Sequence, residues 1–419
     1  MSNLAIKGGI KAIKVPLPHE VWPPDALNDE LKEISKQRNT DISIRGRVGP
    51  IKELEEDFRK FLNNKVDYLV SFNSGTSALL AAYFALNINE NDEVIGSALT
   101  YHAALSPVYF LKGSVVLADI DIKTRCIDSK KIERLITDRT KVITVVHQWG
   151  HPVDMDAILK IKKKYKLKLI EDCSHAHGSK YKGKLCGTFG DIAVFSLQTN
   201  KMVFAGEGGI LVTNNKELYD RATLLGHYRN RSREEIDDEE YQKYWVTGFG
   251  LKLRMSPFNA IVAKHSLKHF KKRVKSKHKC LNYFRRRLEE VRYIDPPYVA
   301  PYAYMGAWYG FKPLYKKERL KNLPREELLR VLRAEGMEIS VPSGPVLASL
   351  PLYSESPDLM FPSRVGKYVN EEKNFPVAQK VEDEALSLPT FWDWEKGKII
   401  IDQYIDAFKK VEENIGELV

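Results

Sequence analysis

The chain has 419 residues, of which 43% are hydrophobic and 29% charged, which is typical of a globular protein with a large core and a second domain. No apolar run reaches the roughly 18 residues of a membrane span, and the first residues lack an apolar leader, so we expect an untargeted cytoplasmic protein without membrane contact. Four cysteines (Cys126, Cys173, Cys186 and Cys280) are too few and too scattered for a disulfide framework, which fits a reducing compartment.

The formal net charge of +11 raises the question of a nucleic-acid partner. Basic residues concentrate over residues 264–287 and in short runs such as 162–164, but no nucleic-acid-binding module accompanies them. The basic stretch is interpreted either as a solvated helix face or as a means of attracting a phosphorylated or nucleotide-linked substrate. We therefore expect no nucleic-acid partner.

The first half of the chain alternates between strand-like and helical patterns. Prolines 16, 18, 23 and 24 prevent a long early helix, and a short helix is predicted over 24–36, a loop over 42–50 and an amphipathic helix over 51–62. Strands are predicted over 68–72, 93–95, 114–117, 142–146, 167–170, 192–197 and 210–213, with helices over 76–86 and 155–165 among them. This alternation predicts an α/β fold with a mainly parallel sheet flanked by crossover helices. In such sheets ligands bind beyond the carboxyl ends of the strands.

A boundary is predicted at Ser256 and Pro257, an N-cap followed by a proline at the first helical position. The helical pattern then continues to about residue 288 and carries the chain out of the first domain. Beyond it we predict strands over 308–313 and 337–340 and helices over 325–335 and 402–415, which together form a smaller α+β domain. The predicted parts are an N-terminal segment 1–50 that packs on the small domain and the active site, a large domain 51–256, and a linking helix with the small domain 257–419.

Residues 73–79 (NSGTSAL) follow a strand and open a helix, as an anion site for phosphate requires. An ordinary N-cap loop is the alternative, and the stretch is neither a Walker A loop nor a GxGxxG fingerprint. Tyr101 lies just past the next strand, where a ring either stacks on a cofactor or fills the core.

Polar residues also end two later strands. Asp172 follows a buried strand, where a carboxylate is costly without a cationic partner such as a protonated ring nitrogen; a helix cap is the alternative. Ser196, Gln198 and Lys201 follow the next strand, ahead of a glycine-rich turn at 206–209. A lysine there is suited to form a Schiff base with an aldehyde cofactor, although most lysines are simply solvated.

A metal site is considered because Cys173, His175 and His177 alternate in the sequence. Their spacing matches no zinc pattern, and strand alternation would leave them without further ligands, so we expect no metal. His147 and His151 are set aside for the same reason. The other polar residues together supply the parts of a pyridoxal phosphate site: a phosphate loop, a stacking ring, an acid for the ring nitrogen and a lysine.

The set of motifs resembles the DegT/DnrJ/EryC1/StrS sugar aminotransferases from about Gly46 to the C-terminus. The motifs that carry the resemblance are residues 74–79 (SGTSAL), 100–101 (TY), 171–175 (EDCSH), 187–191 (GTFGD), 195–198 (FSLQ) with Lys201, and 206–209 (GEGG). The resemblance implies an aspartate-aminotransferase-like subunit of pyridoxal phosphate fold type I. It also implies a homodimer with active sites shared at the interface.

The resemblance also assigns a role to each matching position. Lys201 would form the internal aldimine and carry the proton, Asp172 would pair with the pyridinium nitrogen, and Tyr101 would stack on the ring. The phosphate would be held by Gly75, Thr76, Ser77, Ser196 and Gln198. His175 matches a position near the ring substituents of the cofactor.

One segment departs from the family. Where members have an asparagine that reaches the phosphate of the partner subunit, residues 250–255 read GLKLRM and place Lys252. A lysine can serve as a point charge on that phosphate, contact a substrate phosphate instead, or point elsewhere. Members that became dehydratases replace the active-site lysine by histidine, whereas Lys201 is present here.

We therefore predict an aminotransferase that uses pyridoxal 5'-phosphate in a ping-pong mechanism of two half-reactions. Glutamate or glutamine donates the amino group, and the expected acceptor is a nucleotide-linked keto-sugar, with other keto-sugars and keto-cyclitols as alternatives. A sugar dehydratase or deoxygenase on the same fold and a non-catalytic regulatory relative are the rival hypotheses. A Rossmann oxidoreductase is disfavoured because no glycine fingerprint is present.

Overall fold

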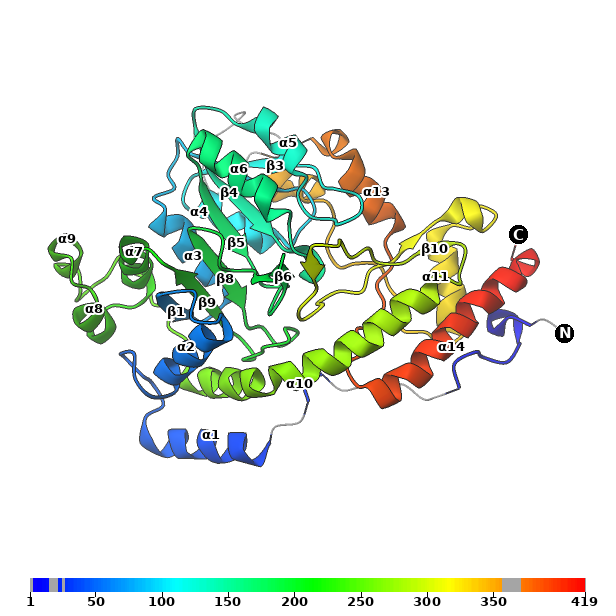
Figure 1. Cartoon of the computed structure of the whole chain (residues 1–419), viewed down its shortest axis with the longest axis horizontal. Helices are drawn as coiled ribbons and strands as arrows, with labels where there is room; N and C mark the ends of the chain where they lie inside the picture. The colour runs from blue at the N-terminus through cyan, green and yellow to red at the C-terminus, as the bar shows by residue number, and fades with distance from the viewer. Residues whose placement is uncertain (1–2, 15–21, 25–26, 356–370, 419) are drawn as a thin grey trace.

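The computed structural model describes residues 3–14, 22–24, 27–355 and 371–418 (Figure 1). Pro16, Pro18 and part of the helix predicted over 24–36 lie outside these ranges. A body built on a seven-stranded sheet and a smaller second body are joined by the long helix α10 (Pro257–Leu288), which runs beneath both in the view of Figure 1. None of the helices in the described ranges combines the length and apolarity needed to cross a bilayer.

The sheet is mainly parallel, as predicted. Its strand order is β1 (Tyr68–Phe72), β9 (Gly209–Thr213), β8 (Ile192–Ser196), β5 (Lys168–Asp172), β4 (Thr140–Val146), β2 (Glu93–Ser97) and β3 (Ser114–Ala118). Only β9 runs against its neighbours, pairing antiparallel with β1 and β8. Every predicted strand of this sheet forms, with ends within two residues of the prediction.

Helices cover both faces of the sheet. The helix α3 (Gly75–Ala85) has no polar face, so it lies buried against the sheet, and its Tyr83 hydroxyl donates to the carbonyl of Ala104. The amphipathic α2 (Gly49–Phe61) buries Ile51, Leu54 and Phe58 against the other face. The remaining helices around the sheet are α4 (Ser106–Phe110), α5 (Ser129–Ile132), α6 (Met155–Tyr165), α7 (Lys216–Gly226), α8 (Asn230–Glu235) and α9 (Glu239–Gln242).

The second body has its own apolar core. Phe284 of α10 packs there on Phe311, Phe391 and Tyr404. Its elements are β10 (Ile294–Asp295), β12 (Leu314–Tyr315), α11 (Arg325–Ala334), α12 (Pro351–Ser354), α13 (Pro376–Glu384) and α14 (Trp394–Glu413). A separate three-stranded sheet has β6 (Lys180–Tyr181) at its centre, between β11 (Ala303–Tyr304) and β7 (Lys184–Leu185). Leu4, from the N-terminal segment, is buried in this core. The exact domain limits stay a prediction.

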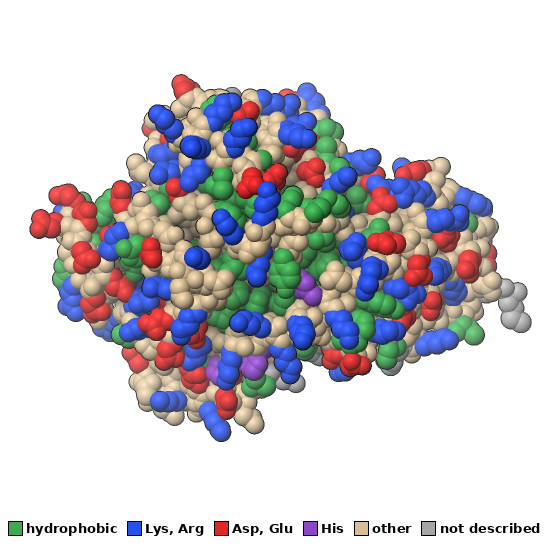
Figure 2. Space-filling view, viewed as in Figure 1, with side chains coloured by type: hydrophobic (Ala, Val, Ile, Leu, Met, Phe, Trp, Pro, Cys, Tyr) green, Lys and Arg blue, Asp and Glu red, His purple; other side chains and the backbone are tan. Residues whose placement is uncertain are grey.

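Basic residues of α10 form ion pairs with acidic residues of neighbouring helices. Lys264 contacts Glu33 of α1 (Asn28–Thr40), and Arg287 contacts Asp402 of α14. In Figure 2 the basic side chains are spread among acidic ones over the visible face rather than gathered in one patch. The solvated-face interpretation of the positive charge is therefore favoured.

Three predictions for the second body were wrong. The strand predicted over 308–313 does not form, because Trp308 has a left-handed backbone with φ +44°, and only Phe311 makes a bridge, to Leu388. The segment 337–340 likewise contributes one bridge, at Ser340. The helix predicted from 402 begins earlier, at Trp394, because the Asp393 side chain caps it by accepting backbone N–H bonds.

Candidate active site

The predicted site residues lie at the carboxyl ends of neighbouring parallel strands. Asp172 is the last residue of β5, and Ser196 is the last residue of β8, the strand beside it. Because these strands run in the same direction, their polar ends meet at one edge of the sheet. The sequence prediction of a site at this edge agrees with the strand order.

The N-terminus of α3 meets the end of β8. A Cβ atom on Gly75 would lie 2.8 Å from the Cβ of Ser196, so only glycine permits this approach. Ser74 caps the helix, its Oγ accepting the backbone N–H of Ser77 at 3.0 Å, and Thr76 is exposed. The remaining free N–H groups and the helix dipole make this junction suited to a phosphate.

A buried ion pair supports the strand that leads into this loop. The Arg231 guanidinium donates to Glu55 at 2.8 and 3.1 Å, and both side chains are at most 1% exposed. Glu55 in turn accepts the backbone N–H and the hydroxyl of Ser71, two residues before the loop begins. The sequence analysis missed this pair, since its members are 176 residues apart.

Lys201 and Asp172 are both buried and act on each other electrostatically. Burial lowers the pKa of Lys201 to about 8, and the negative charge of Asp172 opposes that change. Burial raises the pKa of the Asp172 carboxyl, whereas hydrogen bonds from Ser174 and the positive charge of Lys201 lower it by less. A buried carboxylate of this kind gains from a cationic partner, which a protonated ring nitrogen would supply.

Tyr309 joins the site from the second body and was missed by the sequence analysis. Its ring stacks on His175 with centroids 4.1 Å apart and planes 8° apart, and the Lys201 Nζ lies 4.0 Å from its centroid. Burial and the positive charge of Lys201 hold the pKa of His175 well below its ordinary value, so the imidazole is neutral. Its Nδ1 has no hydrogen-bond partner among the described residues.

Tyr101 does not fill the core. The residue is 61% exposed, and its ring contacts that of the neighbouring His102, so the core interpretation is wrong and Tyr101 is accessible to a ligand. Burial raises the pKa of Tyr309, and the nearby Tyr101 hydroxyl contributes to the same change.

Two predicted residues do not reach the site by contacts within this chain. The Gln198 amide oxygen accepts the N–H of Asn200 at 2.8 Å and so turns back on its own loop. Lys252 is exposed and has no ion pair within the described part of the chain. Its segment lies beside the loop that precedes α3, because the Leu253 carbonyl accepts the N–H of Asn73.

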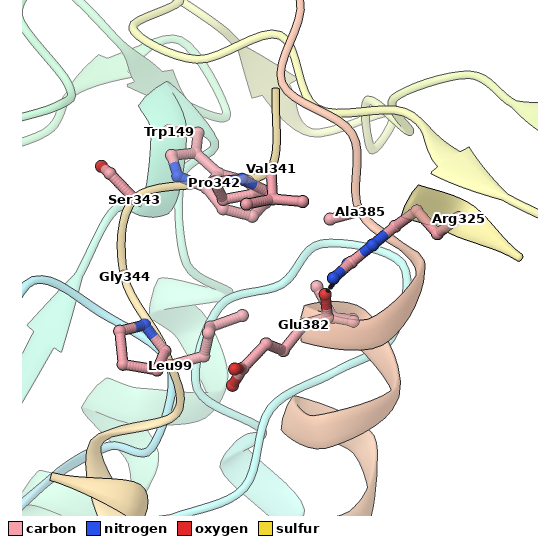
Figure 3. A pocket seen from close by; sticks show the side chains of 11 residues that line it. Leu99, Trp149, Arg325, Val341, Pro342, Ser343, Gly344, Glu382 and Ala385 are labelled. Carbon is pink, nitrogen blue, oxygen red and sulfur yellow. Dashed lines mark hydrogen bonds between the residues drawn. The ribbon is translucent and has the colours of Figure 1, made fainter. Parts of the chain in front are cut away.

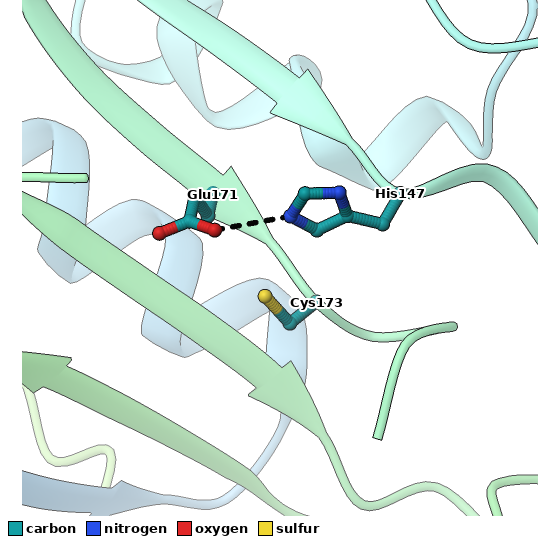
Figure 4. Close-up of side chains that lie close together, drawn as sticks. All are labelled: His147, Glu171 and Cys173. Atoms are coloured by element: carbon teal, nitrogen blue, oxygen red, sulfur yellow. Dashed lines mark hydrogen bonds and ion pairs between the residues drawn. The ribbon is translucent and has the colours of Figure 1, made fainter. Parts of the chain in front are cut away.

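His147, Glu171 and Cys173 lie within metal-ligand distance of one another just behind the site (Figure 4). Two of the three already have hydrogen-bond partners: His147 Nε2 donates to Glu171 at 3.1 Å, and its Nδ1 accepts the N–H of Val153. Glu171 also accepts the backbone N–H groups of Gly187, Phe189 and Gly190 at 2.7–2.8 Å. These hydrogen bonds favour a structural role for the cluster, which holds the end of β5 in place, over a metal site.

A cavity of about 170 Å³ lies beside the Tyr101 loop (Figure 3). Trp149, Leu99 and Pro342 line it, together with Arg325, which donates to the Glu382 carbonyl. Trp149 has a left-handed backbone with φ +53°, which is rare for a bulky residue and typical of functional sites. This cavity has room for part of a small ring compound.

The residues present fit pyridoxal 5'-phosphate. Lys201 is a buried amine with a lowered pKa, Asp172 is a buried acid suited to a ring nitrogen, Tyr101 offers an exposed aromatic ring, and the Gly75 junction is suited to an anion. On a mainly parallel sheet, this arrangement defines a pyridoxal-phosphate-dependent enzyme of the aspartate-aminotransferase type.

The chain belongs to the DegT/DnrJ/EryC1/StrS aminotransferase family, whose family model matches residues 25–402. It is 37% identical over 243 residues to GDP-perosamine synthase of Escherichia coli O157:H7, which covers 58% of this chain and 64% of that protein. It is 29% identical over 434 residues to L-glutamine:scyllo-inosose aminotransferase of Streptomyces griseus, which covers 100% and 99%.

Among solved structures, an aminotransferase from Psychrobacter cryohalolentis superposes with a TM-score of 0.81 at 24% identity, covering 95% of this chain and 100% of that one. The protein is therefore an aminotransferase that uses pyridoxal 5'-phosphate, and the predicted fold and cofactor are confirmed.

Proposed function

We propose that this enzyme moves an amino group from glutamate or glutamine to a keto group on a sugar, nucleotide-linked in the first instance, or on a cyclitol. The two half-reactions share one site. The observation that carries the proposal is the buried Lys201 amine beside the Asp172 carboxyl at the carboxyl edge of the sheet. Two relatives with sugar or cyclitol products in their names, GDP-perosamine synthase and L-glutamine:scyllo-inosose aminotransferase, support the substrate class.

Lys201 and Asp172 divide the acid–base work. When bound, pyridoxal phosphate supplies an electron sink for negative charge at the substrate carbon. The Asp172 carboxylate would hold a proton at the ring nitrogen, which preserves that capacity. With a pKa of about 8, Lys201 has a sizeable neutral fraction near pH 7.5, so its amine can accept a proton from the substrate carbon and return it.

The other residues bind and orient. The Gly75–Ser77 turn and Ser196 would hold the phosphate, and Tyr101 would stack on one ring face. His175, neutral and backed by Tyr309, presents an unpartnered Nδ1 that is suited to hydrogen-bond a ring substituent. We further propose that the acceptor ring occupies the cavity lined by Trp149, since aromatic faces pack well against the apolar face of a sugar or cyclitol.

We propose a homodimer in which each site takes residues from both subunits. Lys252 supports this arrangement because its exposed ammonium has no ion pair in the described part of its own chain. In the partner site a lysine would act as a point charge on phosphate.

The test is a screen of nucleotide-linked keto-sugars, sugar phosphates and keto-cyclitols with glutamine or glutamate, following the keto acid formed from the donor. We expect transfer to at least one ring ketone, and its loss in Lys201→Ala. Formation of a deoxysugar without donor consumption would instead support the dehydratase hypothesis. Failure of both donors to convert the bound cofactor would support the regulatory one.

A further inference from the structure

A second lysine, Lys312, is partly buried in the second body, three residues beyond Tyr309. Its ammonium donates to the Ser387 hydroxyl, and it has no ion pair with a carboxylate in the described part of the chain. Burial lowers the pKa of Lys312 to about 8, and no negative charge is named among the causes. The contrast with Lys316, four residues further on, is direct, because that lysine pairs with Glu384.

Backbone pairing fixes the position of Lys312. The chain on either side of it runs antiparallel to residues 385–388: the Leu388 N–H donates to the Phe311 carbonyl, and the Leu386 N–H donates to the Pro313 carbonyl. Lys312 and Ser387 are therefore held opposite each other. The hydroxyl restrains the ammonium and leaves two of its three N–H donors for another acceptor.

The charge of Lys312 acts on the reaction centre. Three residues before it, Tyr309 stacks on His175 and contacts Lys201, and the positive charge of Lys312 is among those that lower the pKa of His175. A partly desolvated cation without an anion among the described residues is unfavourable, so this position is suited to an anionic ligand. That ligand is not the cofactor phosphate, for which we propose the junction of Gly75 and Ser196.

We propose that Lys312 binds the α-carboxylate of the amino donor. The inference rests on the proposed function and specifies how one site recognises its first substrate. In glutamate and glutamine a carboxylate is bonded directly to the carbon that reacts, whereas a sugar or cyclitol ketone carries neutral hydroxyl-bearing carbons there. Between the two substrates, only the donor therefore brings a negative charge next to the reacting carbon.

The test compares donors with and without the carboxylate in the holoenzyme. The donor half-reaction is followed by the cofactor absorbance with L-glutamine and with 4-aminobutanamide, which is glutamine without its α-carboxylate, and likewise with L-glutamate and 4-aminobutanoate. In Lys312→Met we expect kcat/KM for the amino acid to fall about 100-fold, as for a lost charge-assisted hydrogen bond, while the decarboxylated donor changes little. Lys312→Arg should recover part of the loss, and Lys317→Met, the same change at an exposed lysine of the same body, should have no effect.

A second measurement does not depend on turnover. Calorimetry of the cofactor-free protein with glutaramate or glutarate, the donors without the amino group, should show binding that Lys312→Met weakens by a similar factor. Far-ultraviolet circular dichroism and cofactor content identify variants that misfold. If Lys312→Met misfolds, binding is compared between the parent enzyme, Lys312→Arg and Ser387→Ala instead. The Ser387 variant should weaken glutaramate binding less than Lys312→Met does.

Three results would overturn the proposal: an equal fall for both donors of a pair, no fall for the amino acid, or a loss confined to the acceptor half-reaction. If no ring ketone is aminated by the parent enzyme, the proposed function fails on its own. The donor comparison and the calorimetry would still decide the role of Lys312.

Discussion

The pKa of Lys201 gives the most direct test of the site, and it is measured without substrate. At pH 7.5 a lysine with a pKa of about 8 is about one quarter neutral, against about one part in a thousand for an unperturbed lysine. Neutral amine is the reactive form, so modification of Lys201 in cofactor-free protein should rise with pH around a midpoint near 8. The assay is competitive reductive methylation with isotopic formaldehyde, read by mass spectrometry of the Lys201 peptide.

Asp172→Asn separates the two causes of this pKa. Burial lowers the pKa of Lys201 and the Asp172 charge raises it, so removing the charge should move the midpoint down, by about one pH unit. Asparagine keeps an oxygen that can accept the Ser174 N–H, which preserves the local backbone. Asp156→Asn, at an exposed carboxylate that pairs with Lys182, is the control and should leave the Lys201 midpoint unchanged. A parent midpoint near that of free lysine, or an upward move in Asp172→Asn, would refute the reasoning.

Three further predictions concern the loop, the dimer and the support beneath the loop. Gly75→Ala places a Cβ 2.8 Å from the Cβ of Ser196 and should weaken cofactor binding at least about tenfold in a fluorescence titration, while the same overlap lowers the unfolding midpoint; unchanged affinity would mean that the junction does not hold phosphate. If sites are shared, a mixture of inactive Lys252→Ala and Lys201→Ala subunits should regain about a quarter of the parent activity after exchange, whereas sites contained in one chain would give no recovery. Arg231→Met leaves its buried carboxylate partner without its main counter-charge and should lower the free energy of unfolding by about 3–5 kcal/mol in urea titration; a loss below about 1 kcal/mol would show that water reaches the pair.

The sheet was predictable because each of its strands carries its signal locally. The run over 68–72 and the helix over 155–165 form with the predicted limits, since apolar periodicity and flanking turn residues lie within the segments themselves. The strands and helices thus follow from patterns that short stretches of sequence contain. The grouping of Gly75 with Ser196, by contrast, was anticipated through the resemblance to the family.

The second body was predicted less well because its contacts are made between distant segments. Trp308 has a left-handed backbone that no local pattern announced, and this conformation turns the chain so that Tyr309 meets His175, 134 residues earlier. An apolar run such as 308–313 indicates burial but not the partner that buries it. The sequence therefore predicted the residues on the sheet side of the proposed site and missed Tyr309, which the second body contributes.

Lys201 and Lys312 show why burial alone does not define a catalytic lysine. Burial lowers the pKa of both to about 8, so the two amines have comparable neutral fractions near neutral pH. Their partners differ: Lys201 has the charge of Asp172 beside it, and Lys312 has the Ser387 hydroxyl. A carboxylate that is already present compensates the protonated amine and allows it to gain and lose a proton within one cycle. An ammonium that contacts a hydroxyl and no carboxylate among the described residues is stabilised instead when an anion arrives, and its pKa should then rise. The first arrangement suits proton transfer and the second suits binding, which is why we assign the chemistry to one lysine and donor recognition to the other.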